Sequence, residues 1–188
     1  LTKIMLAHSI ENCAQVVEET DPDTKNKKSK QIFPRFHQLS VVESLLADVR
    51  HNGVGQRYLI QHSAGSGKSN SIAWLAHQLI GLERTDGSTI VDSVLVVTDR
   101  VILDKQIRDT IKQFMQVSNT VAWAEHSGNL RDAINGGKKI IITTVHKFPV
   151  ILDSIGTEHK GRNFAIIIDE AHSSQSGSMS AQMNIVLS

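Results

Sequence analysis

The chain has 188 residues, 40% of them hydrophobic, and a formal net charge of +1. A net charge this close to zero excludes an overall basic surface for nucleic acid, so any such binding has to be local. The single cysteine, Cys13, excludes an internal disulfide and a cysteine-based zinc site. The apolar stretches are too short to span a membrane and no signal peptide is evident, so we expect a cytoplasmic protein without membrane contact. Because the chain starts at Leu1, we also expect it to be a piece of a longer one.

The first 30 residues predict a connector helix followed by a charged linker. Apolar residues recur at helical spacing through residues 3–19. Residues 21–30 are polar and lysine-rich, which is typical of a solvated linker. A nucleic-acid role for these lysines is the less favoured alternative. Residues 33–38 then introduce a second helix, which continues to Val49 and ends at residues 53–55.

The next three segments have the order that a phosphate-binding loop requires. Residues 57–61 form a short apolar run that predicts a buried strand, and residues 70–80 show helical spacing. Between them lies the sequence His-Ser-Ala-Gly-Ser-Gly-Lys-Ser, at residues 62–69. Lys68 would reach the β- and γ-phosphates of a nucleotide, and the Ser69 hydroxyl would bind Mg²⁺.

The glycines of this segment explain why it can wrap around a phosphate. Gly65 and Gly67 allow the backbone to turn tightly and to point successive N–H groups inward. The helix that follows adds a partial positive charge at its N-terminus. The first glycine of the strict pattern G-x-x-x-x-G-K-[ST] is replaced by His62. A glycine-rich turn that binds nothing is the alternative interpretation.

The rest of the chain alternates predicted strands with predicted helices. Because the main strands are continuously apolar, the pattern predicts an α/β fold with a mostly parallel sheet and helices on both faces. The predicted strands are residues 94–98, 120–124, 139–144 and 164–168, and the predicted helices are residues 101–114, 130–134 and 145–152.

Polar motifs lie at the carboxyl ends of four of the predicted strands, at residues 62–69, 98–100, 143–144 and 169–172. Ligands of such sheets bind outside the carboxyl ends of the strands, so these motifs should converge in the folded protein. The alternative for the acidic pair Asp169 and Glu170 alone is a solvated strand end.

The chemistry of phosphoryl transfer assigns a role to each acid. Mg²⁺ needs oxygen ligands, largely water, and Asp169 would hold it through that shell alongside Ser69. Glu170 would orient and deprotonate the attacking water. Together with Lys68, these residues are the predicted catalytic set for ATP hydrolysis.

These residues resemble the nucleotide site of a superfamily 2 helicase or translocase of the DEAH type. The resemblance rests on Gly65-Ser66-Gly67-Lys68-Ser69 followed by Asp169-Glu170-Ala171-His172. It implies a RecA-like P-loop NTPase lobe, an adenine-reading role for Gln38, and a link from the ATP site to DNA through His172.

Three further stretches resemble the motor subunit of type I restriction enzymes. They are Phe36-His37-Gln38, the run from Val97 to Arg100 with residues 103–106, and Thr143-Thr144 with Lys147-Phe148. In that family a histidine in place of the first loop glycine is usual. The resemblance covers about residues 33–176 and implies residues 31–188 as the first motor lobe, after a connector at residues 1–30.

The resemblance implies a subunit that translocates double-stranded DNA with ATP and Mg²⁺ and cuts at a distance. Its expected partners are the DNA, the methyltransferase and specificity subunits, and a second motor lobe and nuclease domain beyond this sequence. Two alternatives remain: an RNA or DNA-repair helicase of the same superfamily, or a nucleotide-dependent switch that never turns over. The intact Lys68, Ser69, Asp169 and Glu170 argue against the switch.

By the same resemblance, five residues are expected to touch the phosphates of one DNA strand: Thr98, Arg100, Thr143, Thr144 and Lys147. Such contacts position the strand without reading its sequence. The alternative is that Thr98 and Thr143 only favour the strand conformation and that Arg100 pairs with a neighbouring acid. Apart from His172, the histidines show no spacing typical of metal ligands, and we interpret them as ordinary polar residues.

Overall fold

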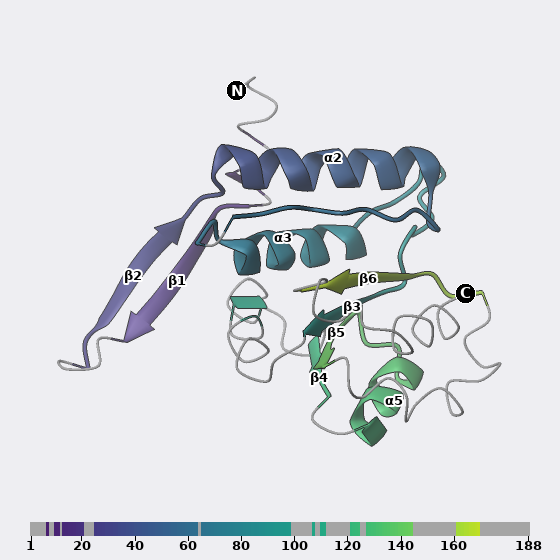
Figure 1. The fold of residues 1–188 in the computed structure, drawn as a ribbon. Helices are drawn as coiled ribbons and strands as arrows, with labels where there is room; N and C mark the ends of the chain where they lie inside the picture. Colours follow the sequence, from purple (N-terminus) through teal and green to yellow (C-terminus); the bar gives the residue numbers. More distant parts are fainter. Residues whose placement is uncertain are drawn as a thin grey trace.

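The computed structural model describes residues 7, 10, 11, 13–20, 25–63, 65–98, 107, 110, 111, 121–124, 127–144 and 161–169. Figure 1 shows a sheet with helices packed against it and a separate hairpin at one end. The α/β architecture predicted from the sequence is confirmed. Within these residues, no helix is both long enough and apolar enough to cross a membrane.

The central sheet is parallel throughout and has the strand order β4-β5-β3-β6. β3 is one of its two inner strands, and Val96 of β3 lies opposite Ile142 of β5 on one side and Ile167 of β6 on the other. Continuous β-branched residues favour such strands because both faces are covered. The strands are β3 (Ser93–Thr98), β4 (Val121–Trp123), β5 (Ile140–Thr144) and β6 (Phe164–Ile168).

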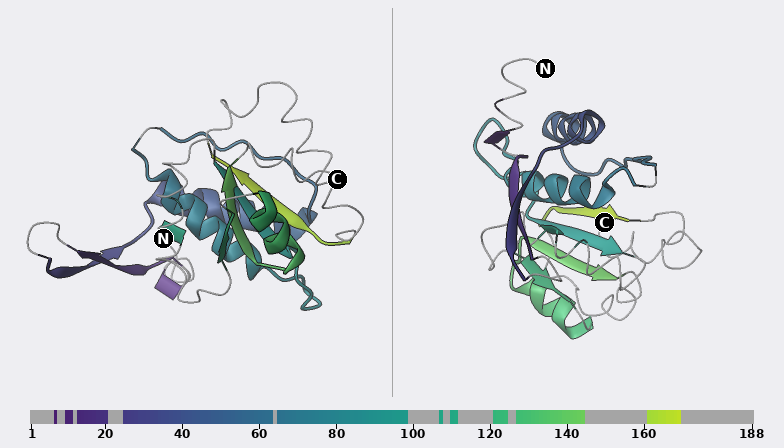
Figure 2. Two further views of the ribbon diagram at one scale, coloured as in Figure 1. Left: turned by 90° about the horizontal axis from the view of Figure 1, so that it is seen from below. Right: turned by 90° about the vertical axis from the view of Figure 1, so that its left-hand side faces the viewer.

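Along each strand, alternating side chains belong to two hydrophobic clusters, one on each face of the sheet. Val94 and Val96 of β3 belong to the cluster under α2 (Phe36–Asn52) and α3 (Lys68–Ile80). Leu95 and Val97 belong to the cluster beside α5, which spans Ser127–Asn135. Figure 2 shows α2 and α3 on one side of the sheet and α5 on the other. The prediction of helices on both faces is therefore confirmed.

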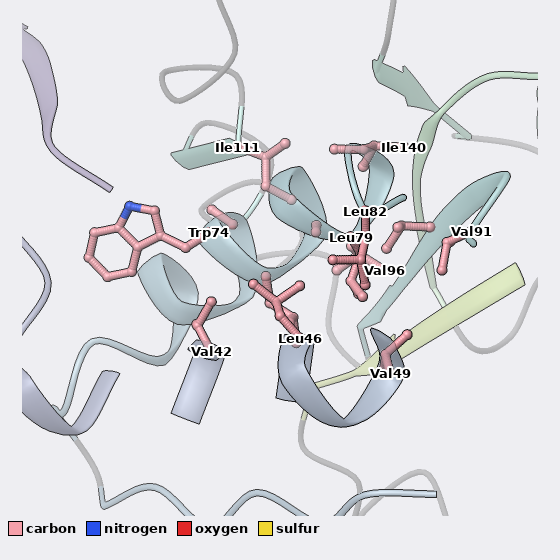
Figure 3. Packing of buried hydrophobic residues seen from close by; sticks show 14 of the residues in the cluster. Val42, Leu46, Val49, Trp74, Leu79, Leu82, Val91, Val96, Ile111 and Ile140 are labelled. Carbon is pink, nitrogen blue, oxygen red and sulfur yellow. The ribbon is translucent and has the colours of Figure 1, made fainter. Parts of the chain in front are cut away.

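The larger cluster lies between α2, α3 and the sheet (Figure 3). It also includes Cys13, near the start of the chain. Trp74 of α3 is almost fully buried, and its indole Nε1 donates a hydrogen bond of 2.9 Å to the carbonyl oxygen of Cys13. A buried indole N–H needs such a partner, because leaving it unpaired costs free energy. The bond anchors the N-terminal segment to α3.

The predicted N-terminal helix and linker are corrected by the structure. Ala7, Ile10 and Glu11 are helical, but β1 (Gln15–Thr20) and β2 (Lys27–Ile32) form an antiparallel hairpin. The hairpin extends away from the sheet in Figure 1. Two adjacent valines at the start of β1 favour a strand. The register places the Cα atom of Glu19 opposite that of Lys28.

The predicted strand at residues 57–61 is wrong. These residues are extended but exposed, and 89% of the surface of Leu59 is accessible. The Tyr58 hydroxyl donates a 2.5 Å hydrogen bond to the Asp48 carboxylate of α2. An apolar run becomes a strand only where its backbone pairs with a neighbour, and within the described residues this segment has none.

The remaining predicted elements differ in how much of each the structure describes. Ile107, Thr110 and Ile111 are helical, as expected for the helix predicted at residues 101–114, and both isoleucines are buried. The predicted short strand and short helix correspond to β4 and α5. The predicted helix at residues 145–152 lies outside the described residues.

Candidate nucleotide site

The glycine-rich loop leads directly into α3, and its glycines have the backbone geometry that the pattern predicts. Gly65 and Gly67 have φ angles of 72° and 83°, a region that residues with a side chain rarely adopt. Gly67 is the N-cap of α3, so the first turn of the helix, with its N–H groups directed toward the loop, begins at Lys68. The loop therefore presents amide donors and a helix N-terminus, which together favour an anion.

Gln38 connects the start of α2 to this loop and is 3% exposed. Its Oε1 accepts a 2.8 Å hydrogen bond from the backbone N–H of Arg35. Its Nε2 donates a 2.9 Å hydrogen bond to the carbonyl oxygen of Gly67. Both ends of the amide are therefore occupied within the protein. The adenine-reading role implied by the resemblance stays a prediction, and in this structure Gln38 positions the loop.

A histidine of α2 lies close to the histidine at the start of the loop. The His37 ring of α2 is centred 5.8 Å from the His62 ring, and His37 Nε2 lies 3.4 Å from the carbonyl oxygen of Ser66. Burial, then His37, then Lys68 lower the pKa of His62. The sequence interpretation of His37 as an ordinary polar residue missed this arrangement. Because 25 positions separate the two histidines, no local spacing signals it.

Two polar atoms of the loop are buried and have no hydrogen-bond partner among the described residues. They are His62 Nε2 and Ser66 Oγ. Buried polar atoms in proteins are normally paired, so each such exception calls for a ligand, a water or a functional reason. A phosphate chain offers oxygen acceptors next to these atoms, next to the N-terminus of α3 and next to Lys68. The residues present therefore fit an anionic nucleotide.

Asp169 follows β6 directly and is held by the sheet. Its backbone N–H donates a 2.9 Å hydrogen bond to Val97 O of β3, and only 9% of the residue is exposed. In Figure 1, α3 begins and β6 ends on the same side of the molecule. Lys68 and Ser69 open α3 and are half-buried. Asp169 thus lies at the carboxyl edge of the parallel sheet, on the side where α3 begins.

The predicted magnesium ligands, Ser69 and Asp169, are too few for a site made of protein atoms alone. The described residues contain no group of three or more His, Cys, Asp or Glu residues that could hold a metal. Mg²⁺ usually binds through one or two protein oxygens, with waters and substrate phosphates completing its shell. The donor set fits that mode, and the assignment of the ion stays a prediction.

The threonines predicted to contact DNA are buried at the ends of β3 and β5. Thr98 and Thr143 are 0% exposed and Thr144 is 4% exposed. The Oγ1 atoms of Thr98 and Thr143 have no partner within the described structure. The three hydroxyls are buried in this arrangement, and their contacts with DNA stay predictions. The remaining predicted site residues, Arg100, Lys147, Glu170 and His172, lie outside the described residues.

A comparison with protein families matches residues 37–188 to the SWI2/SNF2 ATPase family. Among curated proteins, the chain is 31% identical over 165 residues to the C-terminal part of the putative type I restriction enzyme MpnIIP endonuclease subunit, from Mycoplasma pneumoniae. That alignment covers 80% of this chain and 76% of the relative. The family match spans the loop and Asp169. The similarity to the restriction endonuclease subunit confirms the resemblance to a restriction motor subunit.

A second relative is the type I restriction enzyme HindI endonuclease subunit of Haemophilus influenzae. It is 28% identical over 168 residues, and the alignment covers 86% of this chain but only 16% of that relative. Among solved structures, the UvsW helicase from bacteriophage T4 superposes with a TM-score of 0.54 at 16% identity, covering 84% of this chain and 51% of the helicase. At that identity the likeness shows the fold alone, which is helicase-like.

Proposed function

The chain belongs to the SWI2/SNF2 ATPase family, and we propose that it is the ATP-binding lobe of a motor that moves double-stranded DNA within a type I restriction enzyme. The observation that carries this proposal is the loop at residues 62–69. It combines two glycines at positive φ, a helix N-terminus and two buried polar atoms without partners among the described residues. Relatives that carry the same region are type I restriction endonuclease subunits.

The phosphate chain of ATP would lie against the N-terminus of α3. The first N–H groups of that helix would donate to the phosphate oxygens, and Lys68 would add a charge-assisted hydrogen bond. Ser69 and Asp169 would supply the protein oxygen ligands that hold Mg²⁺, and the ion would offset the negative charge of the phosphates. The hydrogen bond from Gln38 Nε2 to Gly67 O holds the loop in place against α2.

Hydrolysis would use the acid next to Asp169. Glu170 would accept a proton from the attacking water, while the loop holds the γ-phosphate in line with it. His172 would pass the state of this site to the DNA-binding surface, as the family resemblance implies. Arg100 and Lys147 would contribute phosphate contacts along one DNA strand, which fix its position without reading bases.

A coupled ATPase assay tests this proposal. Phosphate release is measured for a full-length subunit that carries this sequence, alone, with duplex DNA and with single-stranded RNA. We expect duplex DNA to raise turnover more than RNA, because a DNA motor hydrolyses ATP as it moves. Stimulation by RNA instead would support the alternative helicase. If the protein binds ATP but releases no phosphate in all three conditions, the result would support the switch and contradict the proposal.

A further inference from the structure

Two histidines that the proposed hydrolysis does not use lie close together at the loop, one within it and one on α2. His62 occupies the first position of the phosphate loop, where the strict pattern has glycine, and His37 comes from the first turn of α2. Their rings are 5.8 Å apart with an angle of 59° between their planes. His62 also interacts electrostatically with Lys68. Three groups that can carry positive charge therefore gather where the phosphates would bind.

The hydrogen bonds around the two rings are incomplete in a way that points to a ligand. His37 Nε2 lies 3.4 Å from Ser66 O, and because a carbonyl oxygen only accepts, that nitrogen has to be the donor. His62 Nε2 is buried and has no partner among the described residues. A neutral imidazole has one donor nitrogen and one acceptor nitrogen, and proton uptake makes both of them donors. A protonated His62 could then donate from Nε2 to a phosphate oxygen.

We propose that His62, supported by His37, forms a proton-dependent part of the phosphate site, which takes up a proton as ATP binds. Without nucleotide, the neighbouring His37 and Lys68 and the partial burial of the ring all disfavour a charge on His62. A bound triphosphate reverses the sign of the local field and favours the charged ring. The proposal rests on the proposed function, because it needs ATP at this loop.

The direction of the pH dependence follows from these charges. The pKa of His62 lies below its ordinary value of 6.5 in the free protein, because of burial, His37 and Lys68 in that order. A polyanion beside the ring raises that pKa in the complex. The gain in affinity is therefore full below the pKa of the free protein and is lost as the pH rises through the pKa of the complex. Within that window the affinity changes by at most about tenfold per pH unit, the limit for one proton.

The test measures proton uptake directly. MgATP binding to the full chain is followed by titration calorimetry at pH 6.5, 7.5 and 8.5, in two buffers of different ionisation enthalpy. We expect a buffer-dependent heat that corresponds to up to one proton taken up, and an affinity that falls across this range. The variant His62→Gln should lose both effects, while His37→Gln should reduce them. His51→Gln, at the exposed far end of α2, is the matched control and should behave as wild type.

Ionisation of the nucleotide itself is common to all variants and cancels in these comparisons. Thermal unfolding of each variant shows whether the fold is kept, and if His62→Gln fails to fold, His37→Gln carries the test. Proton uptake that is identical in wild type and His62→Gln would overturn the inference and leave the proposed ATP site intact. If wild-type protein binds no MgATP at any pH, the proposed function itself fails.

Discussion

At the scale of single residues, Gly67 is the most constrained position of the loop. Its φ angle is 83°, its carbonyl oxygen accepts from Gln38, and a Cβ built on it would lie 2.7 Å from Gln38 Nε2. A side chain at this position would therefore strain the backbone and displace the Gln38 amide at once. The loop and the start of α2 depend on each other through this one contact.

The substitution Gly67→Ala separates these two effects when it is compared with Gly87→Ala. Gly87 has a similar φ of 79°, but a Cβ there meets open space. Both variants should lose about 1 kcal/mol or more of unfolding free energy through backbone strain. Gly67→Ala should lose about 1 kcal/mol more, from the disturbed hydrogen bond, and should also weaken ATP binding. Chemical denaturation measures the first quantity. Equal losses in the two variants would contradict the role given to Gln38.

At Trp74, the hydrogen bond and the apolar packing can also be separated. Trp74→Phe keeps most of the buried ring but leaves the Cys13 carbonyl oxygen without the indole donor. We expect a loss of about 1–2 kcal/mol of unfolding free energy. Trp74→Ala also removes the packing and should cost about 3–5 kcal/mol. Should Trp74→Phe prove as stable as wild type by denaturant titration, the N-terminal segment is not anchored through this bond.

At the scale of elements, the sequence predicts the buried strands well and the exposed ones poorly. β3, β5 and β6 are continuous apolar runs, and burial on both faces is the simplest arrangement that such runs allow. The run at residues 57–61 carries the same local signal. It differs only in lacking a neighbour to pair with in the described structure, and a local pattern cannot show which strand lies beside it.

The N-terminal hairpin escapes prediction for a related reason. The apolar residues of the segment before Cys13 follow a helical period, and the same period continues into β1, so the pattern favours one helix. What the local pattern does not contain is the antiparallel pairing of β1 with β2, in which Glu19 lies opposite Lys28 and Val17 opposite Lys30 along the backbone. This pairing joins segments that are separate in the sequence, and it becomes visible only once the register is known.

The candidate site shows the same division. The loop residues and Asp169 could be identified from their types and spacing, because phosphate and metal chemistry demands them. The engaged amide of Gln38 and the pairing of His37 with His62 come from packing of α2 against the loop, which no spacing encodes. The burial of Thr98 and Thr143 likewise follows from their places at the ends of central strands.

At the scale of the whole molecule, the sheet brings the start of α3 and the end of β6 to one side, where Asp169 would complete the metal site. Asp169→Asn keeps the size of the side chain and its backbone bond to Val97 O, but removes the charge that attracts Mg²⁺. ATP binding should weaken several-fold in the presence of Mg²⁺ and should change little in EDTA. Asp132→Asn, on the exposed surface of α5, is the control. A loss of the same size in EDTA would show that Asp169 does not act through the metal.

The proposed function depends on ATP binding at residues 62–69, and equilibrium binding of ATP to Lys68→Ala tests this most directly. Lys68 opens α3 and supplies a charge to the phosphates, whereas Lys139 is exposed before β5 and provides the matched control as Lys139→Ala. Removing a hydrogen bond to a charged group costs about 1.5–3 kcal/mol. Lys68→Ala should therefore bind ATP at least about tenfold more weakly, with an unchanged circular dichroism spectrum, while Lys139→Ala binds like wild type. Equal ATP affinity in Lys68→Ala and wild type, with both proteins folded, would contradict ATP binding at residues 62–69 and with it the proposed function.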